Sequence, residues 1–344
     1  MSDLRFAIFG TGFWARYQMA AWNELKGAKC VAVYNRTRST GAKFASEFSI
    51  PAVYDNPDEL LKHERPDFVD IVTHPYSLSA LVKTAAAHGV PVISQKPMAP
   101  TLAVAHENIL SCRDAGVPYL IHENWRWQSQ LRELKRVLHE GTIGPAFRAR
   151  ISMVSTYPVF INEPHLKDLS EFILTDMGTH ILDVARFLFG EAQRLYCQTH
   201  RVHTDCKGED VATVMLNMHG GTTVTCELGY PENHMESEYF PQTLMFVEGP
   251  LGTIEITRDY WLKVTIASGT DAKRFPPVPY KWANPDYQVV HSSIVNCNAN
   301  LLSALRGEGS AETTADDNYK TLELVFAAYD SSRHEKVIHL GPRG

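Results

Sequence analysis

Short apolar runs alternate with longer amphipathic stretches in the N-terminal part of the chain. The runs have the length of buried strands, and the stretches between them carry helix start and stop signals. Strands and helices in this alternation are typical of a parallel, doubly wound sheet. The predicted strands include Leu4–Phe9, Cys30–Tyr34, Asp67–Thr73, Pro91–Ser94 and Tyr119–Ile121, and the predicted helices include one that ends near Leu25, Leu78–His88 and Thr101–Ala115.

The pattern changes after Trp127, where an amphipathic helix ends at Gly141 and the later apolar runs alternate with a two-residue period. Strands with few helices between them predict a mostly antiparallel sheet in an α+β domain. We therefore predict two domains, residues 1–123 and 124–344. The predicted strands are Thr213–Met218, Thr222–Leu228, Leu244–Glu248 and Gly252–Ile256, and the predicted helices are Leu174–Phe189, Val289–Leu305 and Thr314–Ser331.

The composition argues against several functional classes. The 344 residues carry a net charge of −6 and no basic block, which argues against nucleic acid and anionic membranes as partners. No uncharged apolar run is long enough to span a bilayer. The six cysteines are scattered without a Cys-x-x-Cys pair, which argues against a disulfide framework or a thiolate metal site. The chain enters a strand almost at once and leaves no room for a signal peptide, so we expect a cytoplasmic protein.

A glycine-rich segment follows the first strand directly. Gly10-Thr11-Gly12-Phe13-Trp14-Ala15 has the Gly-x-Gly-x-x-Ala pattern, and a helix follows it. The first glycine of this pattern makes the tight turn, and the second lets the backbone approach a pyrophosphate at the helix N-terminus. We therefore predict a dinucleotide site that includes Gly10, Gly12, Phe13 and Trp14.

The choice between NAD and NADP stays open. An acidic residue about 20 positions after the glycines would bind the adenosine ribose of NAD, but Asn35 stands there and Arg36 and Arg38 follow. Asn35 can bind a ribose hydroxyl, and either arginine can pair with a 2′-phosphate. These residues favour NADP, unless the arginines are merely solvated.

Lys96 follows a short apolar run that Pro97 stops. It therefore lies just past the carboxyl end of a strand, where open α/β sheets bind their ligands, although an arbitrary lysine is more often a solvated surface residue. We assign Gln95 and Lys96, with Thr73 and His74 after the preceding strand, to the cofactor side of the site.

Asp176 and His180 are spaced by four residues on a predicted helix and therefore share a face. A histidine with a carboxylate one turn away can be an acid or base catalyst, although the same spacing often marks a structural pair. We assign no metal site, because Asp183 points away from this face and no further cluster supports one.

Together these stretches resemble the glucose–fructose oxidoreductase / inositol dehydrogenase / MocA (Gfo/Idh/MocA) family over nearly the whole chain. The resemblance implies a Rossmann domain followed by an α+β domain for substrate binding, whose open sheet face mediates homodimer or homotetramer formation. It implies that Lys96, Asp176 and His180 form the catalytic group beside the nicotinamide. The stretches that carry the resemblance are Gly10–Ala15, Ser94–Pro97, Asn124–Arg126, Asp176–His180 and the terminal helix with Ala327-Ala328-Tyr329.

Two residues depart from the family pattern. Gln95 stands where the family usually has glutamate, which removes a negative charge beside Lys96. Asn35 replaces the frequent acidic residue, which leaves the cofactor preference open. Within the family, Gln95–Pro100 and His122–Gln128 look most like bacterial enzymes that oxidise the branched pentose D-apiose to its lactone with NAD, which gives NAD a slight preference over NADP.

The leading interpretation is a nicotinamide-dependent dehydrogenase of a sugar or polyol, with His180 or Lys96 accepting the hydroxyl proton. The alternatives are an NADP-dependent reductase of a small carbonyl compound, or a non-catalytic nucleotide sensor or repressor on the same fold. Asn124 is assigned to the cofactor. The predicted substrate contacts are Lys96, Arg126, Tyr157, Asn162, His165, Asp176 and His180.

Overall fold

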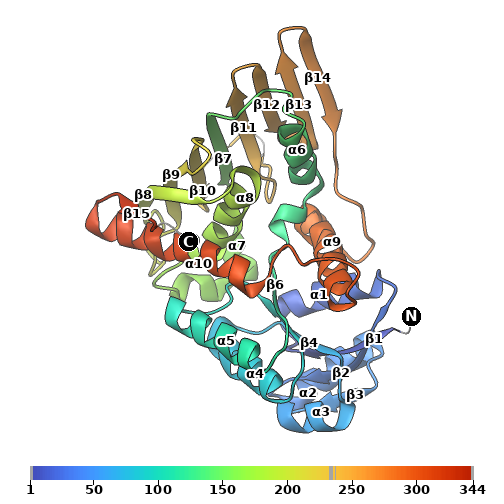
Figure 1. Ribbon diagram of the computed structural model, residues 1–344. Coiled ribbons are helices and arrows are strands. Elements are labelled where there is room, and N and C mark those ends of the chain that lie inside the picture. Colours follow the sequence, from blue (N-terminus) through green and yellow to red (C-terminus); the bar gives the residue numbers. More distant parts are fainter. Residues whose placement is uncertain (1–2, 232–234, 237, 342–344) are drawn as a thin grey trace. The chain divides into compact units, whose positions relative to one another are not determined.

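The computed structural model describes residues 3–231, 235–236 and 238–341 (Figure 1). The chain divides into two compact units. The N-terminal unit comprises Met1–Asn124, Tyr280–Ala283 and His291–Leu322, and the second comprises Trp125–Pro279, Asn284–Val290 and Glu323–Gly344. The first boundary falls one residue from the predicted one, but two later segments return to the N-terminal unit.

The returning segments pack on the first helix. Ala21, Ile294 and Val295 form a buried cluster, against which Tyr17, Leu25, Tyr280 and Trp282 pack. The sequence did not reveal this return, because an amphipathic helix shows the same periodicity whichever unit its apolar face covers.

The N-terminal unit is built on a parallel sheet. Its described residues form six strands in the order β3-β2-β1-β4-β5-β6, the arrangement of a Rossmann fold. The last four residues of β1 are buried in succession, as expected for a parallel sheet covered on both faces. The predicted doubly wound sheet is confirmed. The strands are β1 (Leu4–Phe9), β2 (Ala28–Tyr34), β3 (Ala52–Tyr54), β4 (Phe68–Ile71), β5 (Val92–Gln95) and β6 (Tyr119–His122), and the helices are α1 (Phe13–Asn23), α2 (Arg38–Phe48), α3 (Pro57–Glu64), α4 (Pro75–Ala87) and α5 (Leu102–Asp114).

The second unit is built on a mixed sheet whose order over the described strands is β14-β13-β12-β11-β7-β10-β9-β8-β15. Only β7 and β10 pair in parallel among these, so the predicted mostly antiparallel sheet is confirmed. Burial alternates along β9, which shows that one face of the sheet is covered and the other is open. The strands are β7 (Arg148–Val154), β8 (Ala192–His200), β9 (Val211–Met218), β10 (Thr223–Gly229), β11 (Leu244–Gly249), β12 (Gly252–Thr257), β13 (Trp261–Ile266), β14 (Gly269–Arg274) and β15 (Ile338–His339).

The helices predicted for the later chain are observed, one of them with a different start, and the short helix Val159–Asn162 was not predicted. The predicted helix from Leu174 begins with a π-helical turn, Leu174–Gly178, and continues as α8 (Thr179–Phe189), which packs on β7 and β10 (Figure 1). Across the described residues, no helix is both long and apolar enough to span a membrane. The other helices are α6 (Ser129–His139), α7 (Val159–Asn162), α9 (Gln288–Leu305) and α10 (Ala315–His334).

Candidate active site

The loop after β1 has two glycines with different roles. Gly10 adopts φ +105°, and a Cβ there would lie 2.2 Å from the carbonyl oxygen of Val72, so only glycine fits. Gly12 is the N-cap of α1 with φ −73°, and a Cβ there would meet no atom within 4 Å. The space beside Gly12 therefore borders the first backbone N–H groups of α1, where an anion binds favourably.

A second observation at this edge fits a bound dinucleotide. The hydroxyl of Thr73, in the turn after β4, is buried and has no hydrogen-bond partner among the described residues. A buried polar atom without a partner is costly, and a ligand group supplies such a partner. Thr73 approaches the glycine loop closely, because its Cγ2 would lie 2.9 Å from a Cβ on Gly10. The loop and Thr73 together fit the predicted cofactor edge.

Aromatic side chains surround the glycine loop. The ring of Phe13, which is 37% exposed, meets the rings of Trp14 and Tyr17 edge-on at 5.4 Å and 5.0 Å. Tyr17 in turn stacks on His291, with ring centroids 3.7 Å apart. Burial lowers the pKa of His291 to about 3, so this imidazole is neutral. Phe13 and Trp14 thus lie beside the loop, and their predicted contact with the cofactor stays a prediction. His291 was not anticipated, because α9 lies far along the chain.

Asn35 braces the glycine loop. Its Oδ1 accepts a hydrogen bond of 3.0 Å from the Thr11 hydroxyl, and its Nδ2 donates to the Thr37 carbonyl. Arg38 pairs with Asp55 at 3.6 Å, whereas Arg36 is exposed. The other side chain assigned to this edge, His74, is exposed and stacks on Tyr76 at 5.3 Å.

A row of hydrogen-bonded side chains connects β4, β5 and β6 and includes Gln95, the residue before Lys96. Asp70 of β4 is completely buried and accepts hydrogen bonds from Gln18 and from the Trp22 indole. Gln18 contacts Gln95 of β5, whose amide also lies 3.0 Å from Nδ1 of His122. Burial raises the pKa of Asp70 to about 6, and its N–H donors oppose this shift. Lys96 follows directly and is partly exposed.

Asn124 ends the N-terminal unit and is buried. Its Nδ2 donates a hydrogen bond of 2.8 Å to the hydroxyl of Ser293 on α9. The structure therefore gives Asn124 a role in holding a returning segment, and its predicted contact with the cofactor stays a prediction.

His180 in the second unit is held by a tryptophan. The Trp125 indole stacks on the His180 ring at 4.4 Å between centroids and 24° between planes. Its Nε1 donates a hydrogen bond of 2.8 Å to Thr243, which fixes the indole. Sequence reasoning missed this role of Trp125, although the residue lies within a stretch that carries the family resemblance.

Arg126 makes a buried bidentate ion pair with Asp183, one turn beyond His180 on α8. The two hydrogen bonds, from Nε and Nη2, measure 2.7 Å and 2.6 Å. Arg126 is 5% exposed and Asp183 is completely buried, so breaking the pair would leave a costly uncompensated charge. Arg126 therefore anchors α8, and its predicted contact with substrate stays a prediction.

The π-helical turn that carries Asp176 has its own anchor. Oε1 of Glu209 accepts hydrogen bonds from the backbone N–H groups of Phe172 and Leu174 and from the Tyr329 hydroxyl. Tyr329 also accepts from the backbone N–H of Thr175 at 3.2 Å. Burial raises the pKa of the Glu209 carboxyl. Such π turns occur often at functional sites, and this one holds Asp176 partly exposed.

The remaining predicted substrate residues lie in the segment after β7. Tyr157 stacks on Phe240 at 4.3 Å, and its hydroxyl donates to Asp286 at 3.2 Å. His165 is exposed in the 3₁₀ turn Pro164–Asp168. The side chain of Asn162 lies outside the described part of the chain.

One cluster in the second unit has the residue types of a metal site. His203, Cys206 and Asp210 place their donor atoms within 4.8 Å of one another. However, the Asp210 carboxylate already accepts hydrogen bonds from the backbone N–H groups of Val202 and His203 and contacts Nδ1 of His203 at 2.6 Å. The buried Asp210 carboxylate thus closes this loop by hydrogen bonds within the protein, which explains why the three side chains lie together. We assign no metal to the cluster.

Comparison with known proteins extends over the whole chain. Residues 4–122 match the model of an oxidoreductase family with an NAD-binding Rossmann fold, and residues 131–259 match a GFO/IDH/MocA C-terminal domain. A D-apiose dehydrogenase of Paraburkholderia graminis is 39% identical over 97% of this chain and 89% of its own. A D-apiose dehydrogenase of Rhizobium rhizogenes is 36% identical over 99% of each chain. An oxidoreductase of Agrobacterium radiobacter, solved with NAD+, L-tartaric acid and magnesium, is 36% identical, with a TM-score of 0.95 over 98% of both chains.

Proposed function

The chain belongs to the Gfo/Idh/MocA oxidoreductase family, and on that premise we propose that it oxidises D-apiose, or a closely similar aldose, to the lactone with NAD+. The observation that carries the proposal is the similarity to two D-apiose dehydrogenases over at least 97% of the chain. The open space beside Gly12 and the unpartnered hydroxyl of Thr73 support dinucleotide binding.

The reaction removes a hydride from the anomeric carbon and a proton from its hydroxyl, and bound NAD+ supplies the hydride acceptor. We assign the proton to a ring nitrogen of His180, whose imidazole Trp125 holds by stacking. Lys96 donates a hydrogen bond from Nζ to the reacting oxygen, and Asp176 orients the histidine from the preceding turn. The protein thus supplies orientation and proton transfer.

The proposal is tested by measuring NAD+ and NADP+ reduction over a panel of aldoses and polyols. We expect D-apiose with NAD+ to give the largest kcat/KM. A larger kcat/KM with NADP+ and another sugar or carbonyl compound would mean that the protein uses a different substrate and cofactor from those proposed. Dinucleotide binding without turnover of any compound in the panel would favour a nucleotide sensor.

Replacing Arg36 and Arg38 together by alanine tests the cofactor preference. Arg36 is exposed and Arg38 pairs with Asp55, and neither residue is required by the proposed contacts to NAD+. We expect KM for NAD+ to change less than about twofold and KM for NADP+ to rise about tenfold or more, the cost of one lost charge-assisted contact. The exposed Lys43 offers a matched control, Lys43→Ala. Equal effects on both cofactors would mean that the arginines do not read the 2′-phosphate.

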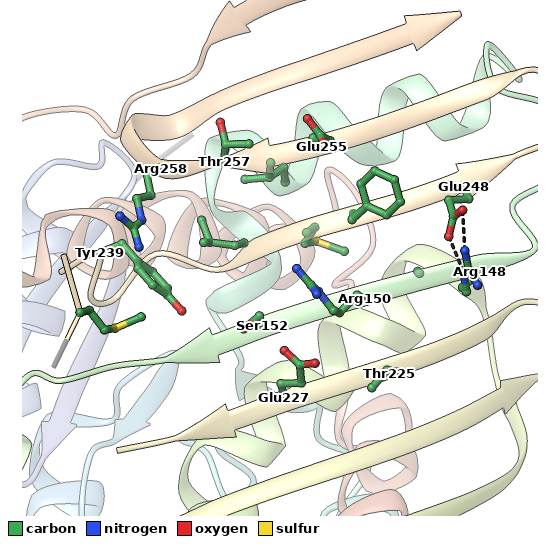
Figure 2. Close-up of a pocket in the computed structure, with 16 residues that line it drawn as sticks. Arg148, Arg150, Ser152, Thr225, Glu227, Tyr239, Glu248, Glu255, Thr257 and Arg258 are labelled. Atoms are coloured by element: carbon green, nitrogen blue, oxygen red, sulfur yellow. Dashed lines mark hydrogen bonds and ion pairs between the residues drawn. The ribbon is translucent and has the colours of Figure 1, made fainter. Parts of the chain in front are cut away.

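We further propose that the open face of the second-unit sheet joins copies of this chain into a homodimer or homotetramer. Strand register places Met215, Thr225, Arg150, Phe246 and Glu255 in one row across this face. Figure 2 shows a hollow on the face in which side chains of both charge signs lie on neighbouring strands, among them Arg150 and Glu227. A face with both signs and a 50% exposed methionine suits an isologous contact.

Introducing a charge into this row should separate the copies. Phe246→Asp and Met215→Asp each place a carboxylate in the proposed contact, where burial without a partner is costly. We expect light scattering after size exclusion to show a monomer for both variants and an oligomer for the wild type. Leu110→Asp on α5, at a similarly exposed apolar position, is the control. An unchanged oligomer in the Phe246→Asp and Met215→Asp variants would place the contact elsewhere.

We also propose a cytoplasmic location. No disulfide joins any of the six cysteines, and all are buried, a state that a reducing compartment preserves. Burial raises the pKa of the Cys30 and Cys112 thiols to about 12, which suppresses the reactive thiolate form.

A further inference from the structure

The row formed by Asp70, Gln18, Gln95 and His122 has a defined hydrogen-bond direction. Both carboxylate oxygens of Asp70 accept N–H groups: Gln18 Nε2 lies 2.8 Å and 2.9 Å from them, and Trp22 Nε1 lies 2.7 Å from one. An ionised carboxylate accepts hydrogen bonds and donates none. Gln18 must therefore turn its NH₂ group toward Asp70 and its carbonyl oxygen away from it.

The direction is passed on to Gln95. Because Gln18 presents its carbonyl oxygen, Gln95 must present its NH₂ group in return, as the contact from Gln95 Nε2 to Gln18 Oε1 shows. The same NH₂ group faces Nδ1 of His122 at 3.0 Å, which makes Nδ1 the acceptor and places the imidazole proton on Nε2. Oε1 of Gln95 is thereby turned away from both neighbours, on the residue that directly precedes Lys96.

We propose that Asp70 and Gln18 are positioning residues that fix the polarity of the Gln95 carboxamide, so that Gln95 presents a hydrogen-bond acceptor, Oε1, to the bound nicotinamide dinucleotide. The acceptor that Gln95 offers is set by a buried charge that lies two side chains away. Its role toward the cofactor rests on the proposed function, whereas the direction of the row is a property of the protein alone.

The burial of the row makes the direction strict. Asp70 is completely buried, and Gln18 and His122 are each 1% exposed, so a reversed Gln18 amide has no solvent to bind, whereas Gln95 is partly exposed. A reversal at Gln18 therefore also turns Gln95, because the two amides face each other. Asp70→Asn permits such a reversal, because the asparagine NH₂ can donate to a flipped Gln18, and Gln18 then donates to a flipped Gln95.

Two variants test the fixed direction of the hydrogen bonds in this row. Asp70→Asn replaces the two contacts from Gln18 to Asp70 by one hydrogen bond from the asparagine NH₂ to Gln18 Oε1. The rest of the row stays connected in the reversed direction, which turns the NH₂ group of Gln95 toward the cofactor. The double variant Asp70→Asn/Gln95→Glu has the same reversed direction, yet the glutamate presents an oxygen again. Trp22→Phe removes a donor to Asp70 without changing which atoms face one another along the row, and it is the matched control.

Calorimetric titration with NAD+ provides the first measurement. We expect Asp70→Asn to weaken binding about tenfold or more, and the double variant to return to within about threefold of the wild type. Trp22→Phe should stay within about twofold of the wild type. Thermal unfolding establishes that each variant is folded. A double variant that binds no better than Asp70→Asn would overturn the role of Gln95 toward the cofactor.

Nitrogen NMR of histidine-labelled protein provides the second measurement, which needs neither cofactor nor activity. The His122 signals are identified by their loss in His122→Gln, at mildly alkaline pH. We expect the proton on Nε2 in the wild type and in Trp22→Phe, and on Nδ1 in Asp70→Asn and in the double variant. A wild-type proton on Nδ1, or a tautomer that Asp70→Asn leaves unchanged, would refute the fixed polarity even if NAD+ binds. Failure of D-apiose as substrate would leave both measurements valid.

Discussion

We expect replacement of Lys96 or His180 by alanine to lower turnover at least about 100-fold while NAD+ still binds, because in the proposed mechanism each residue acts on the reacting hydroxyl. An imidazole accepts a proton near neutral pH without help, whereas a lysine does so only when its surroundings suppress its charge. The Trp125 ring stacked on His180 restricts the imidazole, and in the proposed mechanism its face would stabilise the cation formed by proton transfer. The measurement is kcat with D-apiose and NAD+, together with calorimetric NAD+ binding.

The pH dependence of kcat separates the two roles. A base that must be deprotonated gives a rate that falls on the acidic side, so His180→Ala should erase the acidic limb and Lys96→Ala should retain it. The opposite result would exchange the roles of the two residues. The exposed His139 and Lys43 are matched controls, and their alanine variants should change turnover less than about twofold. Full turnover in both active-site variants would remove these residues from the mechanism.

Gly12→Val should abolish dinucleotide binding and leave the fold intact. A Cβ on Gly12 meets no atom within 4 Å, and its φ of −73° suits any residue, so the protein tolerates the side chain. The added methyl groups would occupy the space through which a pyrophosphate reaches the N-terminus of α1. We expect the calorimetric Kd for NAD+ to rise at least about 100-fold with an unchanged circular dichroism spectrum.

The choice of Gly12 over Gly10 makes this test specific. Gly10 has φ +105° and a Cβ there would lie 2.2 Å from the Val72 carbonyl oxygen, so a substitution at Gly10 disturbs the fold as well as the site. Gly12→Ala provides a graded variant with a smaller side chain and a smaller expected loss. Undiminished NAD+ binding by folded Gly12→Val would show that the cofactor does not approach this loop.

The sequence alone determined the five predicted strands of the N-terminal unit and the glycine loop after the first of them, because these depend on local patterns. Runs of buried apolar residues and helix end signals specify strands and helices within a few residues of their positions. The glycine loop is equally local, because one segment supplies the turn, the backbone approach and the helix N-terminus. The predicted strand Leu4–Phe9 is therefore observed with the same bounds.

The tertiary structure decided which distant side chains meet. Gln18 and Gln95 contact each other although 77 residues separate them, and Glu209 and Tyr329 meet across 120 residues to hold the turn before His180. Neither contact leaves a periodic signal, since a single polar residue in a strand or helix looks the same whether it faces solvent or a buried carboxylate. The return of residues 291–322 to the N-terminal unit was hidden for the same reason. Periodicity reports that a face is buried, whereas only the packed chain determines the residues that bury it.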